Sequence, residues 1–162
     1  MSGPGQELID GYQIRPMVRQ DIEALMEVEL RCYPIPWPES VFLRELEATW
    51  SRIEVVHPTG QAGRLVAHVV YWAVHDELHV LNVAVHPDLR RRGIAQALLN
   101  RLLGVCKAER LQYMTLEVRA SNAAAIGLYE GFGLKSIGTR KRYYADNDED
   151  AVVMAMMIGD NS

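Results

Sequence analysis

Apolar and polar positions follow two different periods along the chain, and the changes of period divide it into strands and helices. Alternating patterns rich in β-branched residues predict strands, and apolar positions three to four residues apart predict helices. The predicted strands cover residues 12–16, 52–57, 64–74, 78–85, 113–118, 134–143 and 151–157. The predicted helices cover residues 21–31, 38–48, 94–109 and 123–130.

The order of these elements predicts a single α/β domain with a mixed sheet. The three strands between residues 52 and 85 follow one another closely, which favours an antiparallel meander. The strand at 113–118 follows a helix, so a right-handed crossover should place it parallel to the strand at 78–85. We assign the domain to residues 12–158 and expect residues 1–11, rich in glycine and polar residues, to form a loose tail.

Composition narrows the class of protein. The 162 residues carry a net charge of −4, which argues against a general nucleic-acid binder. The apolar runs are too short to cross a bilayer, and the N-terminus lacks the apolar core of a signal peptide. Cys32 and Cys106 have no metal-ligand spacing, so we expect neither a disulfide framework nor a metal site. We therefore expect a cytoplasmic protein.

A basic, glycine-containing loop precedes the most strongly patterned helix. Residues 90–95 read RRRGIA and follow the strand that ends at residues 83–85. Cations are disfavoured at a helix N-terminus, but a bound anion removes this conflict. Free backbone N–H groups, a glycine and flanking arginines together favour a phosphate cradle. The alternative is a solvated arginine cluster before an ordinary surface helix.

Two motifs carry a resemblance to a known family. The R-x-x-G-x-A pattern of residues 90–95 resembles the acetyl-coenzyme-A (acetyl-CoA) loop of the GNAT acetyltransferase superfamily. The stretch LEVRASNAAAIGLYEGFG at residues 116–133 is similar to the RimI family, which acetylates the N-terminal alanine of a small-subunit ribosomal protein. The resemblance implies a mostly antiparallel mixed sheet of about seven strands, about four flanking helices, and a parallel βαβ core that binds the coenzyme. Charge and apolar-run length, as above, lead us to expect no direct nucleic-acid partner and no membrane partner.

The resemblance also implies how acetyl-CoA is held. Loop amides would bind the pyrophosphate, and two splayed parallel strands would offer main-chain groups to the pantetheine and thioester. The alternative for the strand is plain core packing, and Asn122 could equally cap the following helix. The residues implied are Val83, Ala84, Val85, Arg90, Arg91, Arg92, Gly93, Ile94, Ala95, Gln96 and Asn122.

Glu117 and Tyr129 are the candidate catalytic residues. Glu117 is a charged residue inside an otherwise apolar strand, and the resemblance implies that it accepts the proton of the acceptor amine. Partial burial should raise its pKa toward neutrality. The resemblance implies that Tyr129 protonates the departing thiolate. The alternatives are a surface-strand glutamate and a packed helix aromatic.

Four aromatic residues are candidates for binding the acceptor: Tyr33, Trp37, Tyr143 and Tyr144. Trp37 belongs to the stiff loop CYPIPWP at residues 32–38, where it could also be a hydrophobic plug. The leading functional hypothesis is acetylation of a protein N-terminus. Acetylation of a small-molecule amine and coenzyme binding without catalysis remain as alternatives, although the presence of both Glu117 and Tyr129 disfavours the second.

Overall fold

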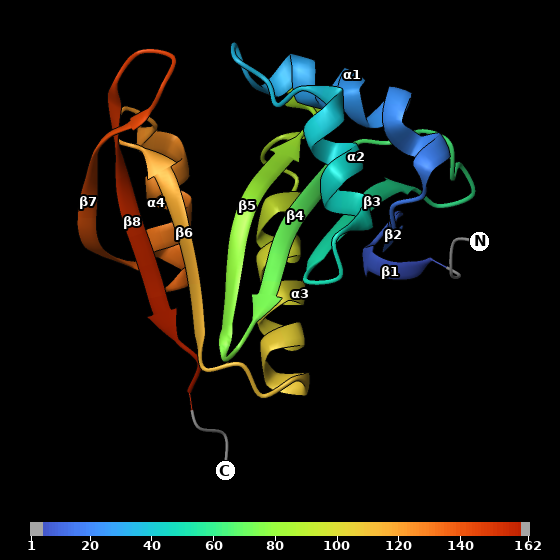
Figure 1. Ribbon diagram of the computed structural model, residues 1–162. Coiled ribbons are helices and arrows are strands. Elements are labelled where there is room, and N and C mark those ends of the chain that lie inside the picture. The colour runs from blue at the N-terminus through green and yellow to red at the C-terminus, as the bar shows by residue number, and fades with distance from the viewer. Residues whose placement is uncertain (1–4, 160–162) are drawn as a thin grey trace.

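Eight strands form one sheet in the computed structural model, which describes residues 5–159. Their spatial order is β1-β2-β3-β4-β5-β6-β8-β7 (Figure 1). The strands are β1 Gln6–Ile9, β2 Tyr12–Pro16, β3 Ser51–Pro58, β4 Ala67–Val74, β5 Glu77–Val85, β6 Tyr113–Arg119, β7 Lys135–Tyr144 and β8 Glu149–Met157. The helices are α1 Ile22–Cys32, α2 Glu39–Glu47, α3 Ile94–Ala108 and α4 Ala123–Phe132, with short 3-10 turns at Arg19–Asp21 and Pro87–Leu89.

The connection between β5 and β6 confirms the predicted crossover. These two strands form the one parallel pair in the described sheet, α3 joins them, and every other neighbouring pair is antiparallel. The meander β3-β4-β5 is likewise confirmed. The fold is therefore the mixed α/β sheet expected from the sequence, with eight strands in place of about seven.

Helices cover both faces of the sheet. Figure 1 shows α3 and α4 behind it and α1 and α2 in front. The apolar stripe of α3, including Leu98, Leu102 and Cys106, is buried in the larger core cluster, so the expectation of a core Cys106 is confirmed. Leu25 of α1 and Phe42 of α2 enter a second cluster on the opposite face. These front helices lie near the end of the sheet where β5 ends, and none of the helices described in residues 5–159 covers the lower part of that face (Figure 1).

A bulge in β5 changes which side chains face each layer. Val70 pairs with Asn82 and Tyr71 pairs with Val80, so Leu81 is an extra residue on β5. Before the bulge, Val80 belongs to the larger core cluster, which contains the stripe of α3. After the bulge, Ala84 belongs to the second cluster, which contains Leu25 of α1.

The sheet divides immediately beyond this bulge. Pairing between β5 and β6 runs from Glu77–Tyr113 to Val80–Leu116 and then stops. From there the two strands diverge (Figure 1), while β6 stays paired with β8 as far as Arg119. The ends of both strands therefore face each other without ladder hydrogen bonds, as the resemblance implied.

Part of the predicted tail is ordered, which corrects that expectation. Residues 6–9 form β1, which pairs with β2 through a turn at Gly11, whose φ of 86° suits glycine. Leu8 and Ile9 pack against the larger core cluster, and the polar composition of the stretch concealed these two apolar anchors. Residues 1–4 of the same prediction lie outside the described residues.

Candidate active site

The basic loop reaches α3 through two left-handed residues. Arg91 has a φ of 66°, and Gly93, the residue that caps α3, has a φ of 83°. No side chain of residues 5–159 caps the helix, so its first N–H groups have no side-chain partner in this part of the chain. Arg90, Arg91 and Arg92 are exposed beside them. Arginines next to open N–H groups of a 15-residue helix form an arrangement suited to an anion.

The last residues of β5 direct main-chain groups into the divergence between β5 and β6. His86 donates its N–H to Val66 O at 2.8 Å, so by alternation Ala84 also faces β4, whereas Val83 and Val85 face the other way. Their carbonyls accept hydrogen bonds from the Tyr33 hydroxyl and, at 3.2 Å, the Cys32 thiol. The N–H groups of Val83 and Val85 therefore point where β6 has left the sheet, and the main chain of Ala84 does not.

Glu117 lies where β6 is no longer paired with β5. Its Oε2 is 2.5 Å from His79 Nε2, and its Oε1 is 3.3 Å from Arg140 Nε. The hydrogen bond with His79, which outweighs burial, lowers the pKa of Glu117 below its ordinary value. The expectation of a raised pKa is therefore wrong, because it considered burial without the hydrogen bond from His79 and the charge of Arg140. Glu117 is ionised at neutral pH.

Tyr129 is a packed phenol on α4. Burial raises its pKa to about 12, so the hydroxyl keeps its proton at neutral pH. The pKa of Tyr33 is raised too, first by burial and then by the neighbouring phenol of Tyr129. Tyr33 contacts the Val83 carbonyl, so these two hydroxyls and the end of β5 lie in one region.

Asn122 caps α4. Its Oδ1 accepts the N–H of Ala125 at 3.1 Å, which confirms the capping alternative. Its Nδ2 makes no hydrogen bond within residues 5–159, so the implied contact with a coenzyme stays a prediction.

The four aromatic acceptor candidates differ in their surroundings. Trp37 packs on Phe42 with ring centroids 5.2 Å apart, so it fixes the loop to the core as the packing alternative proposes. Tyr143 is 48% exposed and lies edge-on to Tyr144 at 5.1 Å. Burial, followed by the charge of Glu117, raises the pKa of Tyr143. Tyr143 therefore lies near the candidate base, whereas Trp37 contributes structure. Acceptor binding by these four residues stays a prediction.

A buried polar cluster ties the loop after α1 to β5, and the sequence analysis missed it. Glu29 is fully buried and accepts hydrogen bonds from His68 Nε2 at 3.0 Å, from Asn82 Nδ2 and from the Trp37 N–H. Asn82 directly follows the bulge residue Leu81. The available signal was a carboxylate four residues after Leu25 on the apolar face of a predicted helix.

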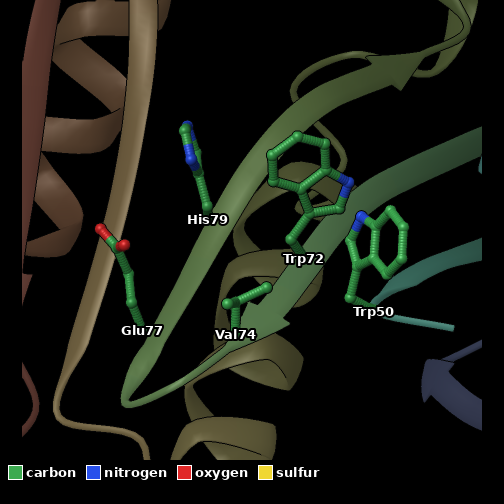
Figure 2. A pocket seen from close by; sticks show the side chains of 5 residues that line it. All are labelled: Trp50, Trp72, Val74, Glu77 and His79. Carbon is green, nitrogen blue, oxygen red and sulfur yellow. The ribbon is translucent and has the colours of Figure 1, made fainter. Parts of the chain in front are cut away.

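His79 was also missed, together with the pocket that it borders. The pocket has a volume of about 440 Å³ on the front face of the sheet. Figure 2 shows its lining residues, Trp50, Trp72, Val74, Glu77 and His79. The signal was the polar pair at positions 77 and 79, which alternation places on one face of the strand that pairs with the strand of Glu117.

Within residues 5–159 no group of three or more His, Cys, Asp or Glu side chains is placed to hold a metal ion. None of the helices in this part of the chain has the length and apolar character needed to cross a membrane.

Comparisons with known proteins agree with this geometry. Residues 22–134 match the model of the acetyltransferase (GNAT) family. A protein of Escherichia coli strain K12, named [ribosomal protein bS18]-alanine N-acetyltransferase, is 36% identical over 140 residues, which cover 85% of this chain and 92% of that protein.

Two solved structures share the fold. The crystal structure of the ribosomal-protein-S18-alanine N-acetyltransferase from Escherichia coli superposes with a TM-score of 0.81 at 33% identity, covering 93% of this chain and 98% of that one. Ard1 from Thermoplasma volcanium superposes with a TM-score of 0.82 at 23% identity, covering 93% and 99%, and shows the fold alone. The expected RimI-type resemblance is thus confirmed, and the chain belongs to the GNAT acetyltransferase family.

Proposed function

We propose that this protein transfers an acetyl group from acetyl-CoA to the N-terminal α-amine of a protein, the alanine of a small-subunit ribosomal protein. The observation that carries the proposal is an ionised Glu117 at the point where β5 and β6 diverge. The protonated hydroxyl of Tyr129 lies on α4, the helix that follows β6. The name and 36% identity of the Escherichia coli relative support the same acceptor.

The residues present fit acetyl-CoA as the donor. The open N–H groups at the start of α3 and the exposed arginines at residues 90–92 would hold its pyrophosphate. The main-chain N–H groups of Val83 and Val85 would hold the pantetheine arm and polarise the thioester carbonyl. Asn122 Nδ2 is available as a further donor. When bound, acetyl-CoA supplies a thioester carbon for attack by the amine.

Glu117 prepares the acceptor. An α-amine has a pKa near 8, so removing its proton at pH 7 costs about 1.4 kcal/mol, whereas a lysine amine costs about 4.6 kcal/mol. A carboxylate with a lowered pKa is a weak base, and its ionised state first favours the binding of a cationic ammonium group. The smaller cost of the α-amine therefore suits this site better than a lysine.

Tyr129 serves the leaving group. Its pKa of about 12 keeps the hydroxyl protonated, and a phenol within reach can donate a proton to a thiolate as it departs. Tyr33, which already donates to the Val83 carbonyl, orders the main chain beside it.

A panel of acceptors tests the proposal. The protein and acetyl-CoA are incubated with an alanine-starting peptide, the same peptide with a blocked N-terminus but an internal lysine, and a polyamine, and products are measured by mass spectrometry. We expect acetylation of the first peptide at its α-amine and at least tenfold slower reaction of the others. Preference for the polyamine or the lysine would overturn the assigned acceptor, and no transfer to any amine would overturn catalysis itself.

A further inference from the structure

His79 contacts the candidate base from the side of the pocket in Figure 2. In the parallel register His79 is opposite Thr115, and Glu117 lies two residues further along β6 on the same face. The two side chains are therefore diagonal neighbours, which brings Nε2 and Oε2 to 2.5 Å. Glu117 is more enclosed, with 10% of its side chain exposed against 24% for His79.

The other ring nitrogen of His79 remains available. Nδ1 makes no hydrogen bond to any group in residues 5–159, and the ring borders a pocket of about 440 Å³. Trp72 flanks the ring edge-on, with centroids 6.1 Å apart. His79 therefore connects the enclosed carboxylate of Glu117 with the pocket.

Carboxylates dominate the charges around this imidazole. Glu77 of β5 lines the same pocket and accepts a hydrogen bond from Thr115 Oγ1 at 2.6 Å. Glu45 of α2 is bound to Trp72 Nε1 at 2.6 Å. On β7, Arg140 contacts the far oxygen of Glu117, and Tyr143 lies near the same carboxylate. An imidazolium at position 79 would thus be bordered by Glu117 and Glu77.

We propose that His79, held in place by Glu117, is where the proton of the acceptor amine is held and from which it leaves to the pocket. The inference rests on the proposed acetyl transfer and assigns to that site a positioning residue. Imidazole is a stronger base than a carboxylate, so a proton taken up by the pair is held on the imidazole. The pair is therefore a better base for an α-amine than Glu117 alone.

One N–H bond of the acceptor ammonium breaks and its electron pair stays on nitrogen. Through water in the pocket, a new N–H bond forms at Nδ1 of neutral His79, whose Nε2–H stays hydrogen-bonded to the ionised Glu117. The pair goes from a charge of −1 to neutral and becomes an imidazolium hydrogen-bonded to a carboxylate. The proton on Nδ1 then passes to water in the pocket, which restores the charge of −1.

The pH dependence of kcat separates this role from a structural one. His79→Gln keeps an N–H donor for Glu117 but cannot hold the proton. We expect it to lower kcat at pH 7 by about 10- to 100-fold and to remove the acidic limb of the pH profile that protonation of an imidazole causes. His75→Asn, at an exposed turn position with a φ of 55°, is the matched histidine control. It should keep the wild-type kcat and the acidic limb.

Chemical rescue gives a second, independent signature. In His79→Ala the pocket opens toward Glu117, so added imidazole should restore at least a tenth of the wild-type rate in proportion to its unprotonated fraction. The same addition to Glu117→Gln should restore nothing. Unchanged kcat and acidic limb in His79→Gln, or no rescue of a folded His79→Ala, would overturn the inference.

A readout without acceptor keeps the two proposals distinguishable. In an NMR titration of the resting protein, the Glu117 carboxyl carbon should shift in a step that coincides with titration of the His79 ring, and His79→Gln should abolish that step. If the step is present and no amine is acetylated, the proposed function fails alone. If acetylation occurs and the step is absent, the role of His79 fails alone.

Discussion

Gly93 is the residue on which the donor loop depends most. Its φ of 83° is strained for any residue with a Cβ, and a Cβ there would come within 3.3 Å of Ile9 Cδ1. We expect Gly93→Val to disturb the N–H groups at the start of α3 and to weaken acetyl-CoA binding by about tenfold or more in calorimetry, because each hydrogen bond to a charged group contributes about 1.5–3 kcal/mol.

Gly104 offers a control in the same helix. It is exposed in α3 with open space around it, so Gly104→Ala should leave acetyl-CoA affinity unchanged and raise the free energy of unfolding by up to about 1 kcal/mol. Equal affinity of Gly93→Val and wild type for acetyl-CoA would show that the loop is not part of the donor site.

The hydroxyl of Tyr129 has a separable role. Tyr129→Phe removes one oxygen from a packed ring, so acetyl-CoA binding should stay within about twofold while kcat falls by about 10²- to 10⁴-fold, the usual contribution of a general acid. Steady-state kinetics and calorimetry on the same samples check both. Tyr113→Phe, at a 40% exposed position, is the control. Wild-type turnover of Tyr129→Phe would leave Tyr129 with packing alone.

For single residues, the sequence could identify the candidate catalytic side chains but not the direction of every pKa shift. Glu117 was recognisable as a charge within an apolar strand. The direction of its pKa shift was not, because His79 and Arg140 reach it from two other strands. Pair contacts between strands depend on register, which a single strand pattern does not contain.

Among the elements, β2 is joined by a buried ion pair to Asp21, the residue that precedes α1. Arg15 and Asp21 make two hydrogen bonds of 2.8 Å. Burial acts to raise the pKa of Asp21, but Arg15 and the Val18 N–H outweigh it and the pKa is lowered. A lowered carboxyl pKa contributes stability that is present above the unfolded pKa of about 3.9 and is lost as pH falls through the folded value.

Asp21→Asn tests this linkage. We expect its free energy of unfolding at pH 7 to fall by about 3 kcal/mol, since Arg15 stays buried without its counterion. Its stability should also decline less steeply than wild type as pH drops below about 4. Urea unfolding between pH 3 and 7 measures both, with exposed Asp10→Asn as control. Parallel pH profiles for Asp21→Asn and wild type would contradict the account.

The Glu29 cluster should hold the loop between α1 and α2 in place. Glu29→Ala removes the acceptor of three buried or half-buried donors, His68, Asn82 and the Trp37 N–H. We expect the free energy of unfolding to fall by about 3–5 kcal/mol. Glu27→Ala, exposed on the same helix, should change it by less than about 0.5 kcal/mol. Urea unfolding decides, and equal stability of the two variants would show that the cluster contributes little.

Elements with strong periodicity were predictable, and those made by long-range contacts were not. The stripe of α3 and the crossover to β6 follow from residue spacing and chain handedness. The strand β1 required the turn at Gly11, and the bulge at Leu81 has no local signature because it is defined by the partner strand β4.

At the scale of the whole molecule, the division of the sheet organises the site. The bulge and the end of pairing after Val80 separate β1–β5 from β6, β8 and β7 (Figure 1). Donor-binding groups come from the end of β5 and the start of α3, while the candidate base comes from β6 and the candidate acid from α4. Acceptor and donor can therefore meet between two halves that a single core cluster, with residues from both, holds together.

The pH dependence of Glu117→Gln tests the central claim most directly. The ratio of wild-type to mutant kcat/KM is measured with an alanine-starting peptide from about pH 6 to 10. If Glu117 serves to remove the proton of an α-amine, the ratio should be largest below pH 7 and shrink at least tenfold above about pH 8, where the amine is already neutral. Recovery only near pH 10 would indicate a lysine acceptor, and a ratio that is constant at every pH would contradict a role for Glu117 in proton removal.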